Sequence, residues 1–205
     1  MNLLKKLHIL PIIFFLASCN VTNVDYLISD QQKILYSIKE IDDTFLKKDI
    51  IFIDITSQSL YFLKKGQVFK KYTISSSKYG TGSSEGSLKT PLGIHSIKQK
   101  IGKDLPLGAI LKGRVWNGDI AQIISEPIDT NFDHVTSRVL WLEGLENGLN
   151  RGKGIDSYNR FIYIHGTAEE GLIGSPASDG CIRMYNDDVV DLYNLSEIDM
   201  PVLIF

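Results

Sequence analysis

The sequence predicts a mostly β domain over residues 50–205, preceded by an N-terminal helix. Short segments rich in β-branched and aromatic residues recur from residue 50 to the C-terminus, with turn residues between them. Before residue 50, apolar residues instead recur at helical spacing. The chain is 43% apolar and 10% aromatic, which is typical of a packed globule and not of a disordered chain.

Residues 1–18 have the pattern of an export signal. Lys5 and Lys6 form a basic start, and residues 7–16 are apolar apart from one histidine. This stretch is too short for a membrane span, which needs about 20 apolar residues. We therefore expect the signal to be removed on export.

The end of this segment, residues 16–19, resembles the bacterial lipobox. The resemblance implies cleavage before Cys19 and attachment of diacylglycerol to its thiol, which would anchor the mature protein to a membrane. With Asn20 after the cysteine, it favours the periplasmic face of the outer membrane if the cell is Gram-negative, and otherwise the cell envelope. An ordinary signal peptide that contains a cysteine is the alternative.

Residues 19–49 are predicted to form a linker and an amphipathic helix. Ile34, Ile38, Ile41 and Phe45 recur at helical spacing with charged residues between them, which predicts a helix over residues 29–48. We expect its apolar face to pack on the main domain; a partner-binding helix is the alternative.

The β domain is expected to open with a meander of short strands. Asn186 is a candidate N-cap for a helix near the C-terminus, with Asp187 and Asp188 in its first turn. Residues 102–133 have weak periodicity, and either a substrate-covering insertion or an irregular surface connection would fit them. The predicted strands cover residues 51–55, 60–63, 68–74, 94–98, 138–142, 160–164 and 201–205.

Charge and spacing exclude several classes of function. The net charge is −2 and no basic run follows the export signal, so nucleic acid is not an expected partner. His95 and His134 are isolated and stand in no metal-ligand spacing, so no metal site is predicted. No cofactor is expected either.

Cys181 lies between a glycine and an isoleucine–arginine pair, downstream of a strand-like segment that ends in His165. The chain has two cysteines, and lipidation of Cys19 would leave Cys181 without a partner in an oxidising compartment. A thiol with a histidine available has the parts of a nucleophile and its base. A buried structural cysteine is the alternative.

The motifs around Cys181 resemble those of the L,D-transpeptidase (YkuD-like) catalytic domain family, over residues 50–205. The resemblance implies a β-sandwich or barrel-like fold and peptidoglycan stem tetrapeptides as substrate. In the family reaction, the cysteine forms a thioester with the stem, and an amine resolves it to give a 3→3 cross-link, a lipoprotein attachment or a D-amino acid exchange. The residues that carry the resemblance are 90–93, 165–167, 174–177 and 178–184, followed by Asn186 and Asp187.

The resemblance also implies roles for individual residues. Cys181 would be the nucleophile, His165 its base, and the carbonyl of Gly166 the group that orients the imidazole. Backbone N–H groups near Gly180 and Cys181 would meet the oxyanion. Arg183 would bind a substrate carboxylate, with a structural salt bridge as its alternative.

Ser178 and Asp179 complete the predicted site. Ser178 is expected to make a supporting hydrogen bond. The family usually has histidine where this chain has Asp179, and a carboxylate near the thiol would raise the pKa of that thiol. Asp179 could instead pair with Arg183 or support His165.

Two other functions therefore stay open beside transpeptidation. One is an L,D-carboxypeptidase or endopeptidase on the same scaffold. The other is a catalytically silent lipoprotein that binds the cell wall.

Overall fold

A computed structural model describes residues 23–130 and 133–205 of the chain. The predicted export signal and Cys19 lie outside the described residues. The elements in chain order are α1 (Asn23–Ile41), the 3-10 helix η1 (Asp43–Lys47), β1 (Ile50–Asp54), β2 (Ser59–Lys64), β3 (Gln67–Ser75), β4 (Gly93–Ile101), β5 (Ala109–Lys112), β6 (Val115–Ile120), β7 (Val135–Gly144), β8 (Tyr163–Thr167), the 3-10 helix η2 (Glu170–Leu172), β9 (Ile182–Met184), α2 (Asn186–Leu195) and β10 (Pro201–Ile204).

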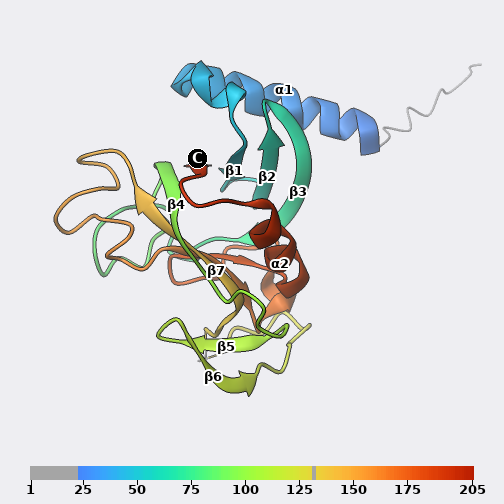
Figure 1. Ribbon diagram of the computed structural model, residues 1–205, viewed down its shortest axis with the longest axis vertical. Helices are drawn as coiled ribbons and strands as arrows, with labels where there is room; N and C mark the ends of the chain where they lie inside the picture. Colours follow the sequence, from blue (N-terminus) through green and yellow to red (C-terminus); the bar gives the residue numbers. More distant parts are fainter. Residues whose placement is uncertain (1–22, 131–132) are drawn as a thin grey trace, which may run out of the picture.

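The strands form one sheet that closes on itself. Their order is β4-β10-β1-β2-β3-β9-β8-β7-β5-β6, and β4 also pairs with β7. This second pairing of β4 joins the two ends of an eight-strand run, so the sheet is barrel-like and the β5–β6 hairpin extends from it (Figure 1). The prediction of a mostly β fold with an N-terminal helix is confirmed.

The main core fills the inside of this closed sheet. Residues of β1 and β2 alternate between the interior and the opposite face, as the period of a strand requires. Helix α2 contributes Val189 and Leu192, both 0% exposed, to the same core. The core also contains Ile51, Ile53, Leu60, Phe62, Ile74, Ile97, Leu140, Leu142, Ile164, Ile182, Met184, Val202 and Ile204.

Helix α1 packs across the outer face of β1 and β2, as the apolar spacing predicts. Ile34 and Ile38 are buried in a second cluster with Phe52 and Tyr61. The helix begins before the predicted residue 29 and ends at Ile41. It stops there because the Asp42 carboxylate accepts a hydrogen bond from the Thr44 N–H and caps a new 3-10 helix, so the predicted continuous helix to residue 48 is wrong.

Two other local predictions are wrong. Arg160 and Phe161 belong to the turn that starts at Asp156, so β8 begins only at Tyr163. Asn186 is not the N-cap of α2. Its side chain is buried and bonds Thr136, Ser137 and Thr167 across the barrel, and Tyr185 takes the cap position without a side-chain bond.

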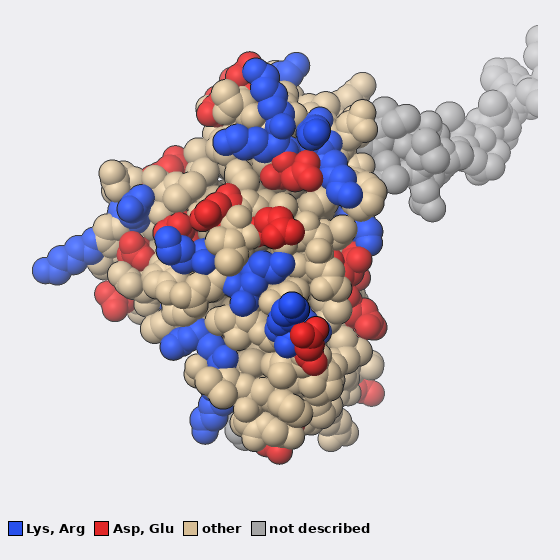
Figure 2. Space-filling view, viewed as in Figure 1, with Lys and Arg blue, Asp and Glu red and all other residues tan. Residues whose placement is uncertain are grey.

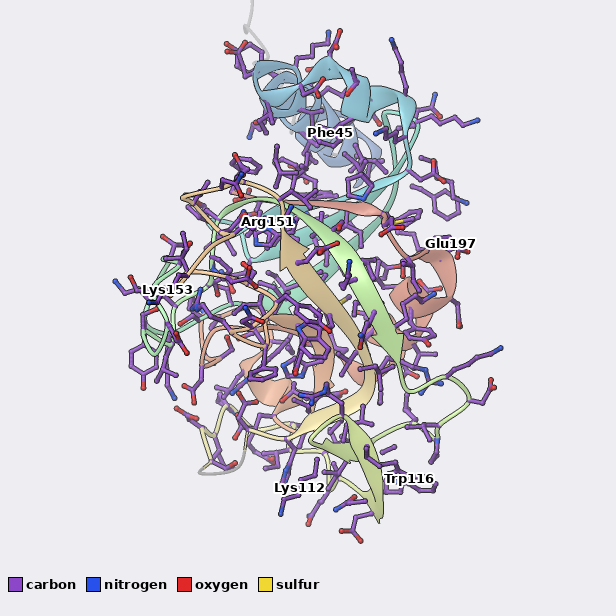
Figure 3. The ribbon with its side chains drawn as sticks, turned by 60° about the vertical axis from the view of Figure 1, so that its left-hand side comes forward. Phe45, Lys112, Trp116, Arg151, Lys153 and Glu197 are labelled. Atoms are coloured by element: carbon purple, nitrogen blue, oxygen red, sulfur yellow. The ribbon has the colours of Figure 1, made fainter. Side chains whose placement is uncertain are left out.

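Residues 102–130 contain the β5–β6 hairpin and then a segment whose Ile124 is hydrogen-bonded to Ala168 and Gly171, just after β8. All six residues of β6 are exposed, including Val115 (69%) and Trp116 (39%). Figure 2 shows few charged side chains at this lower end of the molecule, and Figure 3 shows Lys112 and Trp116 there. The hairpin therefore presents apolar surface.

No helix among the described residues is both long enough and apolar enough to span a membrane.

Candidate active site

The predicted base and nucleophile lie on neighbouring parallel strands. In the register of β8 and β9, His165 is opposite Arg183 and Ile164 is opposite Ile182. Side chains two residues apart on a strand share a face, so Cys181, directly before β9, lies on the same face as Arg183 and His165. The sheet thus brings together residues that are 16 positions apart in the sequence.

His165 is held in one tautomer by the chain itself. The residue is 1% exposed, and its Nδ1 lies 2.7 Å from the carbonyl oxygen of Gly166. A carbonyl only accepts, so Nδ1 carries the proton and Nε2 is the basic nitrogen. Burial lowers the pKa of His165, against the raising effects of the Asp133 carboxylate and the Gly166 carbonyl, so the resting ring is neutral near pH 7.

The Cys181 sulfur is bracketed by backbone groups. Its S–H donates to the carbonyl of Phe161 at 3.3 Å, and the N–H of Tyr163 donates to the sulfur at 3.4 Å. Desolvation raises the pKa of the thiol from 9.0 to about 12, while the Tyr163 N–H opposes that rise. The resting group is therefore a thiol and not a thiolate.

Gly180 and Ser178 shape the turn before the thiol. Gly180 has φ +125°, a conformation that other residues rarely adopt. Ser178 Oγ donates to the carbonyl of Cys181 at 2.6 Å and accepts from the N–H of Gly180 at 3.2 Å. Thr90, from the motif at residues 90–93, donates to the Gly180 carbonyl at 3.0 Å. The Gly180 N–H, a predicted oxyanion donor, thus has an internal partner in this state.

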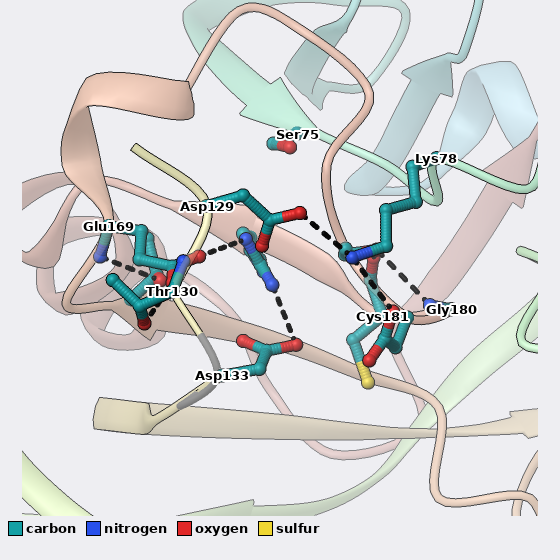
Figure 4. A network of polar contacts seen from close by, with 12 residues as sticks. Ser75, Lys78, Asp129, Thr130, Asp133, Glu169, Gly180 and Cys181 are labelled. Carbon is teal, nitrogen blue, oxygen red and sulfur yellow. Dashed lines mark hydrogen bonds and ion pairs between the residues drawn. The ribbon is translucent and has the colours of Figure 1, made fainter. Parts of the chain in front are cut away.

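Asp179 pairs with a lysine and not with Arg183 or His165, the two partners that the sequence left open. Its Oδ1 lies 3.5 Å from Lys78 Nζ, and the same lysine is 3.0 Å from Asp129 Oδ2 (Figure 4). The pairings of Asp179 with Arg183 and with His165 are therefore not seen. The carboxylate that raises the pKa of the thiol is that of Asp133.

Arg183 is the largest fully buried side chain among the described residues, at 1% exposure. Its Nη2 pairs with Asp133 at 2.8 Å and its Nη1 with Glu169 at 2.9 Å. Its Nε is buried without a hydrogen-bond partner. This arrangement matches the structural salt bridge, and a role in binding a substrate carboxylate would require a carboxylate to move away or the substrate to reach Nε.

Sequence reasoning missed four groups of this site: the Asp133 and Glu169 carboxylates, the Phe161 carbonyl and the Tyr163 N–H. Glu169 is 0% exposed and also accepts from the backbone N–H and hydroxyl of Thr130. Its position four residues after His165 was a usable signal. The two backbone groups have no counterpart in the sequence pattern, and Asp133 falls in the stretch with weak periodicity.

An aromatic wall stands beside the thiol. Trp141 stacks on Tyr158 with ring centroids 4.1 Å apart and meets Tyr163 edge-on at 5.4 Å. Arg114, at the tip of the β5–β6 hairpin, lies over the Trp141 ring at 4.7 Å and donates to the Tyr163 hydroxyl at 3.3 Å. The hairpin is thereby tied to the strand that carries His165.

A cavity of about 580 Å³ lies next to these groups, between the hairpin and the start of β7. Asp133 and His134 line it together with Leu111, Asn117 and Asp119. Among the described residues, no cluster of histidine, cysteine or acidic side chains could hold a metal ion.

The chain matches the model of the YkuD L,D-transpeptidase catalytic domain over residues 48–204. It is 46% identical over 52 residues to a Bacillus subtilis (strain 168) protein provisionally named as the L,D-transpeptidase YqjB, a match that covers 25% of this chain and 28% of that protein. It also resembles the solved L,D-transpeptidase of Mycobacterium smegmatis (16% identity, TM-score 0.45, 77% of this chain and 58% of that one). The solved L,D-transpeptidase of Xylanimonas cellulosilytica DSM 15894 is also similar, with 18% identity and a TM-score of 0.43 over 78% of this chain and 61% of that one. These matches span less than two thirds of each relative.

The family match covers the closed sheet, with His165 on β8 and Cys181 directly before β9. The chain belongs to the YkuD family of cysteine L,D-transpeptidases. The family acts on the stem peptides of peptidoglycan, which implies a place of work outside the cytoplasm.

Proposed function

We propose that the protein is a peptidoglycan L,D-transpeptidase that works through a thioester on Cys181. The observation that carries the proposal is the pairing of β8 with β9, which puts the Cys181 thiol and the His165 imidazole on one face, with His165 Nδ1 bonded to the Gly166 carbonyl. The basic nitrogen of a neutral imidazole is thus available on the side of the thiol.

The first half-reaction requires proton transfer at the moment of attack. Because the resting thiol has a pKa of about 12 and His165 is neutral, little thiolate exists beforehand. Substrate binding brings the carbonyl of the third stem residue to the sulfur, and His165 takes the proton as the C–S bond forms. The imidazolium then gives the proton to the leaving D-alanine amine.

The second half-reaction transfers the acyl group to an amine. A diamino acid side chain of another stem, a lipoprotein lysine or a free D-amino acid would each serve as acceptor. The cavity that Asp133 lines, between the hairpin and the start of β7, is the proposed approach for one of the two peptides.

Incubation with purified tetrapeptide muropeptides, followed by mass analysis of protein and products, tests the proposal. We expect a tripeptide adduct on Cys181, release of D-alanine, and cross-linked or exchanged products when an amine is supplied. Cys181→Ala is the matched control and should carry no adduct. A folded protein that forms no adduct with stem peptides would refute the proposal.

The same experiment separates the hydrolase alternative. Free tripeptide released at an undiminished rate in the presence of amine would indicate an L,D-carboxypeptidase, and cleavage of cross-linked dimers an endopeptidase.

The raised pKa of the Cys181 thiol favours a second candidate, a wall-binding protein without turnover. Binding to purified sacculi that persists in Cys181→Ala, with no adduct on the unaltered protein from either stem peptides or a carbapenem, would support this candidate.

We further propose a division of the chain into residues 1–18 as signal peptide, 19–49 as linker and helix, and 50–205 as the catalytic domain, with lipid on Cys19. The acyl chains of the diacylglycerol would together hold the protein on the membrane, with the outer membrane favoured in a Gram-negative cell. Cys19→Ala should move the protein from the membrane fraction to the soluble fraction after cell lysis. An unchanged distribution would refute the lipid anchor.

A further inference from the structure

Asp133 is a carboxylate whose charge acts on both proposed reacting groups. It raises the pKa of the His165 imidazole and that of the Cys181 thiol. The two half-reactions proposed above give Asp133 no role.

Its position follows from the ion pair with Arg183. Asp133 Oδ2 lies 2.8 Å from Arg183 Nη2, and Arg183 is the cross-strand neighbour of His165. The carboxylate therefore sits over the face of β8 and β9 that carries the reacting groups, as Figure 4 shows for Asp133 and Cys181. Its side chain is 28% exposed and lines the cavity beside the hairpin, so the carboxylate is open to solvent on that side.

The effect of this charge differs between the two half-reactions. While the sulfur attacks, Asp133 favours the imidazolium but disfavours the thiolate, and the two effects oppose each other. While the amine attacks, the sulfur is still part of a neutral thioester, so the unfavourable effect on the thiolate is absent until the C–S bond breaks. During the attack, only the stabilisation of a positive charge on His165 acts.

We propose that Asp133 is a positioning residue for the second half-reaction, where its carboxylate stabilises protonated His165 while an amine attacks the thioester. This inference rests on the proposed function.

The step balances without any further reactant. The amine nitrogen bonds to the thioester carbonyl carbon, and one amine proton moves to His165 Nε2. The C–S bond then breaks, the electron pair stays on the Cys181 sulfur, and His165 returns the proton to it. The products are the new amide and the free thiol.

Other groups around His165 and Cys181 also shape the pH dependence. Arg183 on β9 lowers the pKa of both groups, and Arg160, in the turn before β8, lowers that of the thiol. The Tyr163 ring lies edge-on to His165 on the same strand. All of these remain in a variant that changes Asp133 alone.

The test is the resolution of a preformed acyl-enzyme. The protein is acylated with a tetrapeptide stem, mixed with one D-amino acid at a series of pH values, quenched, and its acyl-enzyme fraction measured by mass spectrometry. For Asp133→Asn we expect the plateau rate to fall about tenfold and the lower pH midpoint to fall, because His165 becomes a weaker base. Acylation should slow much less than resolution.

Glu169→Gln is the matched control. It disturbs the same arginine, but Glu169 is not among the groups that shift His165 or Cys181. Its midpoint should stay at the value of the unaltered protein. Asp133→Glu keeps the charge and should restore much of the resolution rate. If circular dichroism shows Asp133→Asn to be unfolded, Asp133→Ser takes its place.

Equal slowing of both half-reactions with an unmoved midpoint would overturn the inference, as would a midpoint in Glu169→Gln that moves like that of Asp133→Asn. A lack of acyl-enzyme on the unaltered protein would instead count against the proposed function.

Discussion

The resting state of Cys181 is set more by desolvation than by neighbouring charges. Asp179, which replaces the usual family histidine, is paired with Lys78 and is not among the charges that shift the thiol. The charge of Asp133, over the reacting face, does raise the pKa of the thiol. The distinction could not be read from the sequence, because Asp179 is two residues from the thiol and Asp133 is 48.

Alkylation by iodoacetamide separates the two carboxylates, since only the thiolate reacts. Asp133→Asn removes a charge that raises the pKa of the thiol, so its alkylation at a fixed pH below that pKa should be several-fold faster and its pH midpoint lower. Asp179→Asn should match the unaltered protein in rate and midpoint. An acceleration in Asp179→Asn as large as that in Asp133→Asn would contradict this assignment.

Gly166 is expected to accept no side chain. A Cβ there would lie 2.6 Å from Asn186 Oδ1 and 2.9 Å from the Thr136 carbonyl, both closer than real Cβ contacts allow. Gly166→Ala should lower the free energy of unfolding by about 1–3 kcal/mol and slow acylation, because the carbonyl that orients His165 must shift. Urea unfolding and adduct formation measure the two effects.

Gly80→Ala is the comparison for Gly166→Ala. No atom lies within 4 Å of a Cβ at Gly80, although its φ of +81° still strains an alanine. It should lose about 1 kcal/mol of stability and keep the acylation rate. Unchanged stability and acylation in Gly166→Ala would show that the close contact relaxes freely.

Among the elements, those with strong periodicity were predicted from the sequence and those fixed by distant contacts were not. The strands β1, β2 and β3 and the buried face of α1 follow from local pattern. The late start of β8 follows from the turn that begins at Asp156, and the buried position of the Asn186 side chain depends on partners in β7 and β8. For the site, the pair Cys181 and His165 came from motifs, but Asp133 and the backbone groups around the sulfur required the fold.

Helix α1 should contribute measurably to stability through Ile38, which is 0% exposed against the barrel. Ile38→Ala should lower the free energy of unfolding by about 2–4 kcal/mol. Tyr36→Ala, on the 67% exposed side of the same helix, should change it by less than about 0.5 kcal/mol. Chemical denaturation of both variants measures this, and equal losses would mean that the helix does not pack as described.

At the level of the whole molecule, hydrogen bonds hold the long loop between β7 and β8 against the barrel. His95 on β4 has Nδ1 3.0 Å from the Gly93 carbonyl and Nε2 3.0 Å from Ser157 Oγ. Because the carbonyl only accepts, Nδ1 carries the proton and the Ser157 hydroxyl donates to Nε2. Asn150 adds bonds to the Leu92 and Ile94 carbonyls. These contacts support the loop that presents the Phe161 carbonyl to the thiol.

This anchor makes the stability of the whole protein sensitive to acid. Burial lowers the pKa of His95 from 6.5 to about 4, so protons bind the unfolded chain first as the pH falls. The contribution of neutral His95 to the free energy of unfolding is fully present above pH 6.5. About 3 kcal/mol of it is lost as the pH falls from 6.5 to 4. His95→Gln has no group that titrates in this range, so its free energy of unfolding should fall less between pH 7 and 4. Parallel slopes in both proteins would contradict this.

The backbone bracket around the Cys181 sulfur also bears on the chemical lifetime of the protein. Oxidation to sulfenic acid and beyond follows thiolate character and exposure. A sulfur held between the Phe161 carbonyl and the Tyr163 N–H, with its proton retained, resists peroxide far better than the same cysteine in an unfolded chain. Oxidation of Cys181 is therefore expected mainly before folding is complete. In the folded protein the thiol stays protonated and reduced until substrate binds.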